Sequence, residues 1–278
     1  MNSGNKMAAG RDFKLCADDY ALTPAVSLGI LEAVEAGRID ATGAMTTRPF
    51  WRTAAHDLAS LGDAVQVGLH LDLTLGPPLT RAPRLAPKGR LPSIGRWIRM
   101  SRAGALPEAE IRAEIAAQVQ AFGEHYGAPP SFVDGHQHVH MLPGIRDWLL
   151  DELNARGWTG KLWLRDSSDR LERILRRRVE APKALLVKVA GQGFAKLAHK
   201  RGFSTNEGFS GFSAFDPRRD YSADFARFLV APGPRHLIMC HPGRVDSELE
   251  RLDPVTYTRE QELEFLLSDR FEDMMAAR

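Results

Sequence analysis

The chain has 278 residues, 44% of them hydrophobic and 26% charged, with a formal net charge of +2. This length and composition suit one domain with a substantial core, and the weak net charge gives no reason to expect a nucleic-acid partner. Two cysteines are far too few for a disulfide scaffold. No uninterrupted apolar run approaches the roughly 18 to 20 residues needed to span a bilayer.

The first residues, MNSGNKMAAGRDF, contain no apolar run that could act as a signal peptide, so we expect a cytoplasmic protein. We expect residues 1–12 to form a disordered N-terminal extension and residues 13–278 to form a single domain. The sequence leaves the oligomeric state open, and a homo-oligomer is compatible with it.

Short apolar runs alternate with amphipathic periodic stretches along the chain. The pattern predicts strands over 13–17, 41–45, 65–69, 131–133, 161–164 and 236–240. It predicts helices that begin at Pro24 and behind Pro107, and further helices over 144–153 and 260–267. The segment 77–106 is expected to be an inserted loop and 192–220 a second irregular region. This alternation favours an α/β fold with a parallel sheet and helical crossovers, either barrel-like or doubly wound.

Polar residues follow the predicted strands, at the place where the chemistry of α/β folds gathers. They are Asp18, Asp19, His70, Asp134, His136, Arg165 and His241. Because the carboxyl ends of parallel strands meet at one edge of the sheet, we expect these carboxylates, imidazoles and the guanidinium to share one site.

His70 lies among apolar neighbours in VGLHLDL, so it is either a metal ligand at a strand end or a satisfied core histidine. The run DGHQHVH, from Asp134 to His140, favours a metal or catalytic role. If its backbone is extended, its four ionisable groups occur at every second position and share one face. Such crowding indicates a cation or a hydrogen-bond network. Two imidazoles and one carboxylate on a metal leave positions for water and substrate, as both hydrolysis and oxygen chemistry require.

Adjacent Asp18 and Asp19 point to different sides of a strand, so one can bind a metal while the other accepts a proton. His241 precedes a Pro-Gly turn that would leave its imidazole at the mouth of the site, where it suits a general acid. A turn histidine bonded to backbone is the alternative. Cys16 and Cys240 have neither a CxxC partner nor an adjacent base, and we expect both to fill the core.

The segment 170–201 is locally basic and carries interleaved leucine, isoleucine and valine residues. Its basic residues are Arg170, Arg173, Arg176, Arg177, Arg178, Lys183, Lys188, Lys196, Lys200 and Arg201, against Glu172 and Glu180. A solvated helical face is the simpler interpretation. The alternative is an amphipathic element that makes peripheral contact with an anionic membrane surface or meets an acidic ligand.

Four blocks of the chain together resemble the YdjC/ChbG-like carbohydrate deacetylase family, which includes chitooligosaccharide deacetylases and hopanoid-associated HpnK-type members. The blocks are ADDYALTPAVSLGILEA, VGLHLDLTLGPPL, FVDGHQHVHMLPGIRD and MCHPGRVD, in the family's order. The resemblance implies a distorted β/α barrel of the NodB-like deacetylase style, with a mostly parallel sheet and helical crossovers. It also implies that residues 13–278 are one catalytic domain that removes the acetyl group from an N-acetylated amino sugar, either an oligosaccharide or a lipid-linked sugar.

The same resemblance implies a cofactor and its ligands. One divalent metal ion, with Zn or Mg favoured over Co or Mn, would be held by Asp19, His70 and His136. The family commonly has Phe-Gly where this chain has Tyr20-Ala21, and Ser-His-His where this chain has Gly-His-Gln. These departures leave the ligands intact and leave the particular glycan undetermined.

The resemblance also implies roles for the remaining residues of the site. Asp18 would be the general base, His241 the proton donor to the departing amine, and Arg165 a contact to a substrate oxygen. Three further residues would orient the ligands: Asp134, His138 and His140.

Three other functions compete with this interpretation. His70-Leu-Asp72 with a distant histidine is the ligand pattern of iron and 2-oxoglutarate oxygenases, but those enzymes have double-stranded β folds. An amidohydrolase would use the His-x-His pairs, although such a pair usually follows the first strand, which here carries Asp18 and Asp19. A non-catalytic sugar-binding protein could keep the metal as a structural element, but every expected catalytic position is occupied.

Overall fold

The computed structural model describes residues 11–278, and within them eight strands form one sheet. The order across the sheet is β6-β5-β4-β3-β2-β1-β8-β7, and every neighbouring pair is parallel. The strands are β1 (Phe13–Tyr20), β2 (Ala41–Ala44), β3 (Gln66–Leu71), β4 (Phe132–Gly135), β5 (Trp163–Leu164), β6 (Ser204–Thr205), β7 (Phe209–Ser210) and β8 (His236–Cys240). The predicted parallel sheet is therefore confirmed.

The two edge strands, β6 and β7, are consecutive in the chain. Only residues 206–208 separate them. Four residue steps span at most about 14 Å, so the two edges of the sheet lie close together and the sheet curls almost into a closed ring. The fold is thus the distorted, incomplete β/α barrel that was expected.

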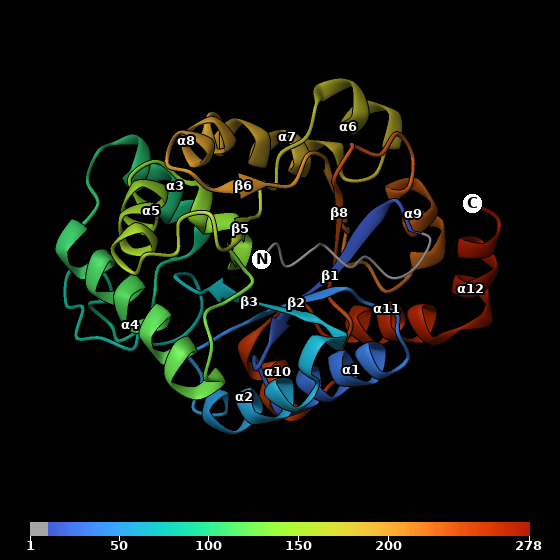
Figure 1. Cartoon of the computed structure of the whole chain (residues 1–278), viewed down its shortest axis with the longest axis horizontal. Helices are drawn as coiled ribbons and strands as arrows, with labels where there is room; N and C mark the ends of the chain where they lie inside the picture. Colours follow the sequence, from blue (N-terminus) through green and yellow to red (C-terminus); the bar gives the residue numbers. More distant parts are fainter. Residues whose placement is uncertain (1–10) are drawn as a thin grey trace.

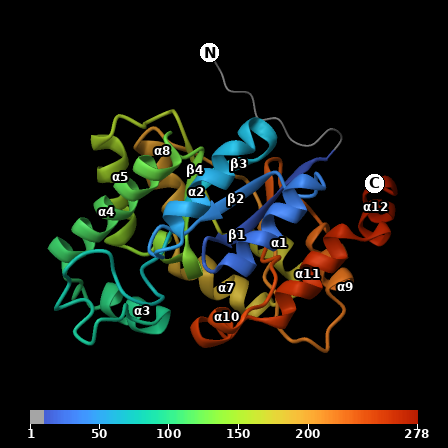
Figure 2. The same ribbon diagram turned by 90° about the horizontal axis from the view of Figure 1, so that it is seen from below.

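Helices surround this curled sheet, as Figure 1 shows, and α1 and α2 lie across β1 to β3 in the view of Figure 2. The α-helices are α1 (Pro24–Glu35), α2 (Trp51–Ser60), α3 (Ile94–Arg102), α4 (Glu108–Tyr126), α5 (Ile145–Ala155), α6 (Leu171–Arg177), α7 (Ala181–Ala190), α8 (Phe194–Lys200), α9 (Tyr221–Phe228), α10 (Ser247–Leu252), α11 (Tyr257–Leu267) and α12 (Asp269–Ala276). None of the helices in residues 11–278 is both long and apolar enough to cross a membrane.

Two segments expected to lack regular structure contain it. The segment 77–106 includes α3, whose Trp97 is buried and donates its indole N–H to the carbonyl of Leu73 at 2.6 Å. The segment 192–220 contains α8 and both edge strands. Strands of two residues are too short to produce an alternating pattern, which is why sequence periodicity missed them.

The core lies on both sides of the sheet, because Leu15 and Ala17 of β1 belong to one buried cluster and Cys16, between them, belongs to a second. All eight residues of β1 are buried, as expected for a central parallel strand. The predicted disordered extension over residues 1–12 falls mostly outside the described residues. The two that are described make contacts: Arg11 pairs with Asp40 at 3.1 Å, and Asp12 pairs with Arg278 at 3.1 Å.

Candidate active site

The carboxyl end of β1 is kinked where the two adjacent aspartates lie. Its pairing with β2 shifts register between Ala17 and Tyr20, and Asp19 has a φ of 71°. Non-glycine residues rarely adopt this left-handed conformation, and it usually persists only at sites with a function or strong tertiary support. The kink sends Asp18 and Asp19 into two different clusters of side chains.

Asp19 lies beside two imidazoles from other strands. Its Oδ1 is 3.3 Å from Nε2 of His70, at the end of β3, and 2.9 Å from Nδ1 of His136, which follows β4. One donor atom from each residue lies within 4.8 Å of the other two. The three residues predicted as metal ligands therefore converge at one point.

The donor atoms of this triad fit a divalent ion. Ligand bonds of about 2.1 Å keep neighbouring donor atoms roughly 3.0 to 3.4 Å apart, close to the spacings seen here. The outer atoms are already held: Asp19 Oδ2 accepts from Arg259 at 2.7 Å, and His70 Nδ1 lies 2.7 Å from Asp134 Oδ1. Such outer partners fix which atoms face the metal.

The electrostatics of the triad favour positive charge. Burial lowers the pKa of His70, but the charges of Asp134 and Asp18 outweigh it and hold that pKa well above its usual value. Burial also lowers the pKa of His136, but Asp19 outweighs this effect and raises that pKa above its usual value. Burial raises the pKa of Asp19, yet His136 and Arg259 hold it well below the usual value.

Asp18 belongs to a second cluster, which a guanidinium fills. Arg165, just after β5, is fully buried and donates to both oxygens of Asp18, at 2.6 and 2.5 Å. Its Nη2 also lies 2.6 Å from Asp134 Oδ2 and 3.0 Å from Cys16 Sγ. Burial raises the pKa of Asp18, but Arg165, helped by His70, brings it down to about 2.

The contacts of Arg165 affect two predictions, the one for Cys16 and the one for Arg165 itself. Cys16 is buried as expected, but its sulfur also contacts the Arg165 guanidinium, which the sequence did not indicate. Arg165 lies at the predicted place after its strand, with no exposed surface left to meet a ligand. Its contacts to Asp18 and Asp134 favour a role in positioning these carboxylates.

The turn that carries His241 is fixed by two helices. Its backbone N–H donates to Glu262 Oε2 of α11 at 2.6 Å, and Gly243 N–H donates to the carbonyl of Arg259 at 3.2 Å. A Cβ on Gly29 of α1 would lie only 2.7 Å from the Cα of Gly243, so only glycine allows this close approach. The His241 imidazole is partly exposed, packed edge-on against Phe215 with ring centroids 5.2 Å apart.

The extended backbone on which a shared face of DGHQHVH depended ends at Gly135, the last residue of β4. After β4 the chain forms a 3-10 turn over His136–Met141, in which Gln137 and His138 have φ values of 52° and 61°. The imidazoles therefore point in different directions. His140 Nε2 lies 2.8 Å from the carbonyl of Arg165, and His138 packs against the rings of Phe209 and Phe212.

Two residues of the site were missed. Arg259 and Glu262 are both about 1% exposed. Arg259 donates to the carboxylate of Asp19, and Glu262 accepts from the backbone N–H of His241. A signal existed in the sequence: both lie on the same stripe of α11 as Leu263 and Leu266, where a core-facing helix normally carries apolar residues.

The carboxylate of Asp72 is not available to the triad. One oxygen accepts from the backbone N–H groups of Thr74 and Leu75, at 3.0 and 2.9 Å, and the other accepts from Thr47. The His-x-Asp pattern of the oxygenase alternative is therefore a turn cap in this fold.

Comparison with known proteins agrees with these observations. The family model described as YdjC-like protein matches residues 14–277. A chitooligosaccharide deacetylase from Salmonella typhimurium strain LT2 is 31% identical over 270 residues, covering 94% of this chain and 93% of the relative. One from Escherichia fergusonii is 41% identical over 130 residues, and this match spans 46% of this chain and only 50% of the relative's length.

A crystal structure from Enterococcus faecalis V583, of a candidate cellobiose-phosphate cleavage protein, has the same fold. It superposes with a TM-score of 0.73 at 22% identity, covering 95% of this chain and 94% of that chain. With the family model matched across almost the whole chain, the conclusion is direct: this chain belongs to the YdjC-like protein family.

Proposed function

We propose that this chain is a metal-dependent carbohydrate deacetylase that removes the acetyl group from an N-acetylated amino sugar, with residues 13–278 as its catalytic unit. The observation that carries the proposal is the convergence of Asp19, His70 and His136 beside a second carboxylate, Asp18. The name chitooligosaccharide deacetylase of a relative that is matched over 93% of its length supports it.

Asp19, His70 and His136 would hold one divalent cation, Zn or Mg in the first instance and Co or Mn in the second. A cation in such a site polarises a carbonyl oxygen and makes water acidic, lowering its pKa from 15.7 toward about 7. Arg259 and Asp134 would orient the two ligands that they hold.

Asp18 would take the proton from the attacking water. Its neighbour Asp19 would be committed to the cation, whereas Asp18 lies one residue away and outside the triad of donor residues. We assign Arg165 to positioning Asp18, through its two hydrogen bonds to that carboxylate, in place of the substrate contact expected from the sequence.

His241 would protonate the amine as the C–N bond breaks. Burial lowers the pKa of His241 to about 4, although Asp19 and Asp18 oppose the shift, so the resting imidazole is neutral at pH 7. It must therefore acquire the proton that it donates during turnover. Its partly exposed position on a tightly held turn suits this proton exchange.

His140 would hold the backbone of Arg165, through its contact with that carbonyl, and so act on Asp18 indirectly. His138 stands apart from the ligands, against Phe209 and Phe212. Because both rings are buried, we assign His138 to packing against this aromatic cluster and not to orienting the ligands.

The test is acetate release, followed by mass spectrometry, from a panel of N-acetylated amino sugars with Zn, Co, Mn and Mg supplied in turn. Chitooligosaccharides and lipid-linked sugars belong in the panel, with simple N-acetyl amides for comparison. Release from a sugar but not from simple amides is expected. Equal rates on both would assign the site to a general amidase, and no release with any metal would refute the proposal.

A matched variant separates catalysis from metal binding. His241→Ala should lose most of its turnover while its metal content, measured by elemental analysis, stays that of the unmodified protein. A large loss of metal in this variant would make His241 a ligand and contradict the assignment.

A further inference from the structure

The outer face of α7 is unusually apolar for a surface helix. Its sequence, APKALLVKVA, is mostly apolar and is interrupted only by Lys183 and Lys188. Of its residues only Ala184 is buried, whereas Leu186 and Val189 are 53% and 60% exposed.

The neighbouring helix α6 extends this surface. It contacts α7 and presents Leu171 and Leu175 at 50% and 52% exposure. Four of the seven large hydrophobic side chains that are exposed in residues 11–278 therefore lie on these two helices. Figure 1 shows α6, α7 and α8 together on one side of the sheet, opposite α1 and α2.

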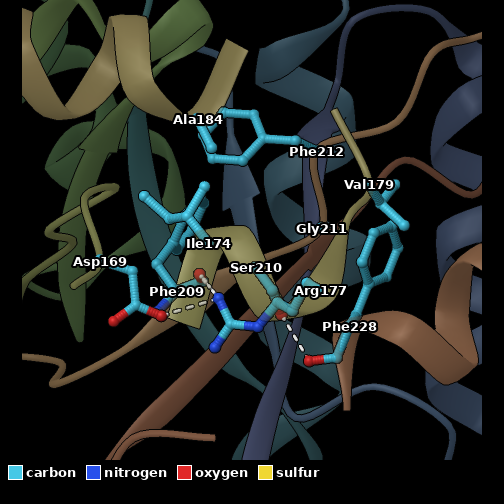
Figure 3. Close-up of a pocket in the computed structure, with 10 residues that line it drawn as sticks. All are labelled: Asp169, Ile174, Arg177, Val179, Ala184, Phe209, Ser210, Gly211, Phe212 and Phe228. Carbon is cyan, nitrogen blue, oxygen red and sulfur yellow. Dashed lines mark hydrogen bonds and ion pairs between the residues drawn. The ribbon is translucent and has the colours of Figure 1, made fainter. Parts of the chain in front are cut away.

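These apolar side chains are not needed for packing inside the protein. The inner faces of the two helices pack through Ile174 and Ala184 into a buried cluster with Phe209 and Phe212. Figure 3 shows these four residues around a small pocket, closed at one side by the Arg177–Asp169 ion pair of 2.7 Å. The outer leucine and valine side chains thus remain free for another contact.

The charge of the same segment favours an anionic partner. Residues 170–201 hold ten basic and two acidic residues, whereas the rest of the chain holds 27 basic and 33 acidic residues. The segment is therefore +8 and the remainder −6. Arg176 and Arg178 are exposed and have no ion pair among the described residues, so they are free to meet an anionic surface.

We propose that the α6–α7 face, defined by Leu171, Leu175, Leu186, Val189 and the surrounding arginines and lysines, docks reversibly on an anionic lipid surface. Apolar side chains that enter the headgroup region, flanked by cations, are the combination that holds amphipathic helices on such membranes. A symmetric dimer through this face would bring the exposed Arg176 and Arg178 of both copies together, which like-charge repulsion opposes.

The test is flotation of the full chain with vesicles of phosphatidylcholine alone and with about one third phosphatidylglycerol. Binding is expected only to the anionic vesicles and should weaken with salt. Leu186→Asp with Val189→Asp should abolish it. Arg176→Glu with Arg178→Glu should lower the partition coefficient by at least about 25-fold, from about fivefold per removed cation.

Two matched controls lie on other parts of the surface. Leu28→Asp changes a side chain of α1 that is equally exposed, at 54%, and Arg52→Glu changes an exposed cation of α2. Both should bind vesicles as the unmodified chain does. No binding to anionic vesicles, or equal loss in the controls, would overturn the proposal. So would a dimer in sedimentation that Leu186→Asp dissociates, because the face would then be covered by a second copy. None of these readouts depends on deacetylase activity.

Discussion

Two acidic clusters lie side by side at the carboxyl ends of the strands, and they differ in what neutralises them. Asp19 shares its cluster with two imidazoles, and Arg259 occupies only its outer oxygen. Asp18 shares its cluster with Asp134 and Cys16, and the Arg165 guanidinium lies among them. In both clusters the possible ligand atoms lie close enough together for one metal ion to bridge them. In the Asp18 cluster the Arg165 guanidinium already lies among these atoms, whereas in the Asp19 cluster no guanidinium does.

The difference teaches that a group of acidic residues is not in itself a metal site. A buried carboxylate needs a counter-charge, and an arginine supplies one permanently. Imidazoles are neutral ligands that leave the charge of a carboxylate to an exchangeable cation. The adjacent aspartates can therefore do different work although they are chemically identical.

The largest effect is expected from Asp19→Asn. A neutral amide replaces the only anion among the three donor residues, so the metal should be lost and kcat/KM should fall by about 10³-fold or more. Elemental analysis and steady-state kinetics measure both. Asp63→Asn, on an exposed turn, is the control. Full metal content in Asp19→Asn would show that the metal does not bind at the Asp19 cluster.

Asp18→Asn should separate catalysis from metal binding. Turnover should fall by about 10² to 10⁴-fold, the range for a lost general base, while the metal content stays unchanged. The isosteric amide keeps the shape of the cluster. If Asp18→Asn loses the metal while Asp19→Asn retains it, the roles of the two residues must be exchanged.

Arg165→Met tests the counter-charge that Arg165 supplies to the cluster of Asp18 and Asp134. Its removal leaves Asp18 and Asp134 buried without their guanidinium, which should lower the free energy of unfolding by about 3 to 5 kcal/mol. Urea unfolding measures the change. Arg218→Met, whose side chain is 88% exposed, should leave the free energy of unfolding unchanged. An Arg165→Met protein of normal stability that has only a raised KM would restore the substrate-binding role.

Glu262 shows what burial does to an acid that has no hydrogen-bonded guanidinium. Burial raises its pKa from 4.5 to about 7, despite the hydrogen bond from the His241 N–H. The folded state then holds a proton that the unfolded state releases, so this group lowers stability as pH rises from about 4.5 to 7, by about 3 kcal/mol.

Glu262→Gln should remove this dependence. The stability of the variant relative to the unmodified protein should therefore increase between pH 5 and pH 8, as measured by urea unfolding at both. Glu264→Gln, on the exposed side of the same helix, should leave the pH dependence as it is. Parallel stability curves for Glu262→Gln and the unmodified protein would mean that Glu262 ionises normally.

The smallest effect is expected from Arg259→Met, which frees the outer oxygen of Asp19. Metal affinity, measured by competition with a chelator, should fall by about 10 to 100-fold, as for other residues that orient ligands. Arg270→Met, at an exposed ion pair with Asp220, is the control. Unchanged affinity would show that the kink of β1 alone orients Asp19.

The sequence by itself determined where the strands of the central sheet lie and which residues follow them. Each of these is a local property: a short apolar run, a turn, and a polar residue at the end of the run. Because parallel strands end at one edge, local patterns sufficed to predict that Asp19, His70 and His136 meet. The four blocks of the resemblance added the family, which the match over residues 14–277 confirms.

Only the tertiary structure decided how the two aspartates are divided. Arg165 reaches Asp18 across 147 positions of the chain, and Arg259 reaches Asp19 across 240. The left-handed residues at Asp19 and His138 turn side chains away from the directions that an extended strand would give them. Such conformations are unfavourable locally and persist because distant contacts hold them, so no local pattern announces them. That is why the sequence and its family resemblance could indicate the candidate ligands Asp19, His70 and His136, whereas they could not indicate the guanidinium that neutralises each aspartate.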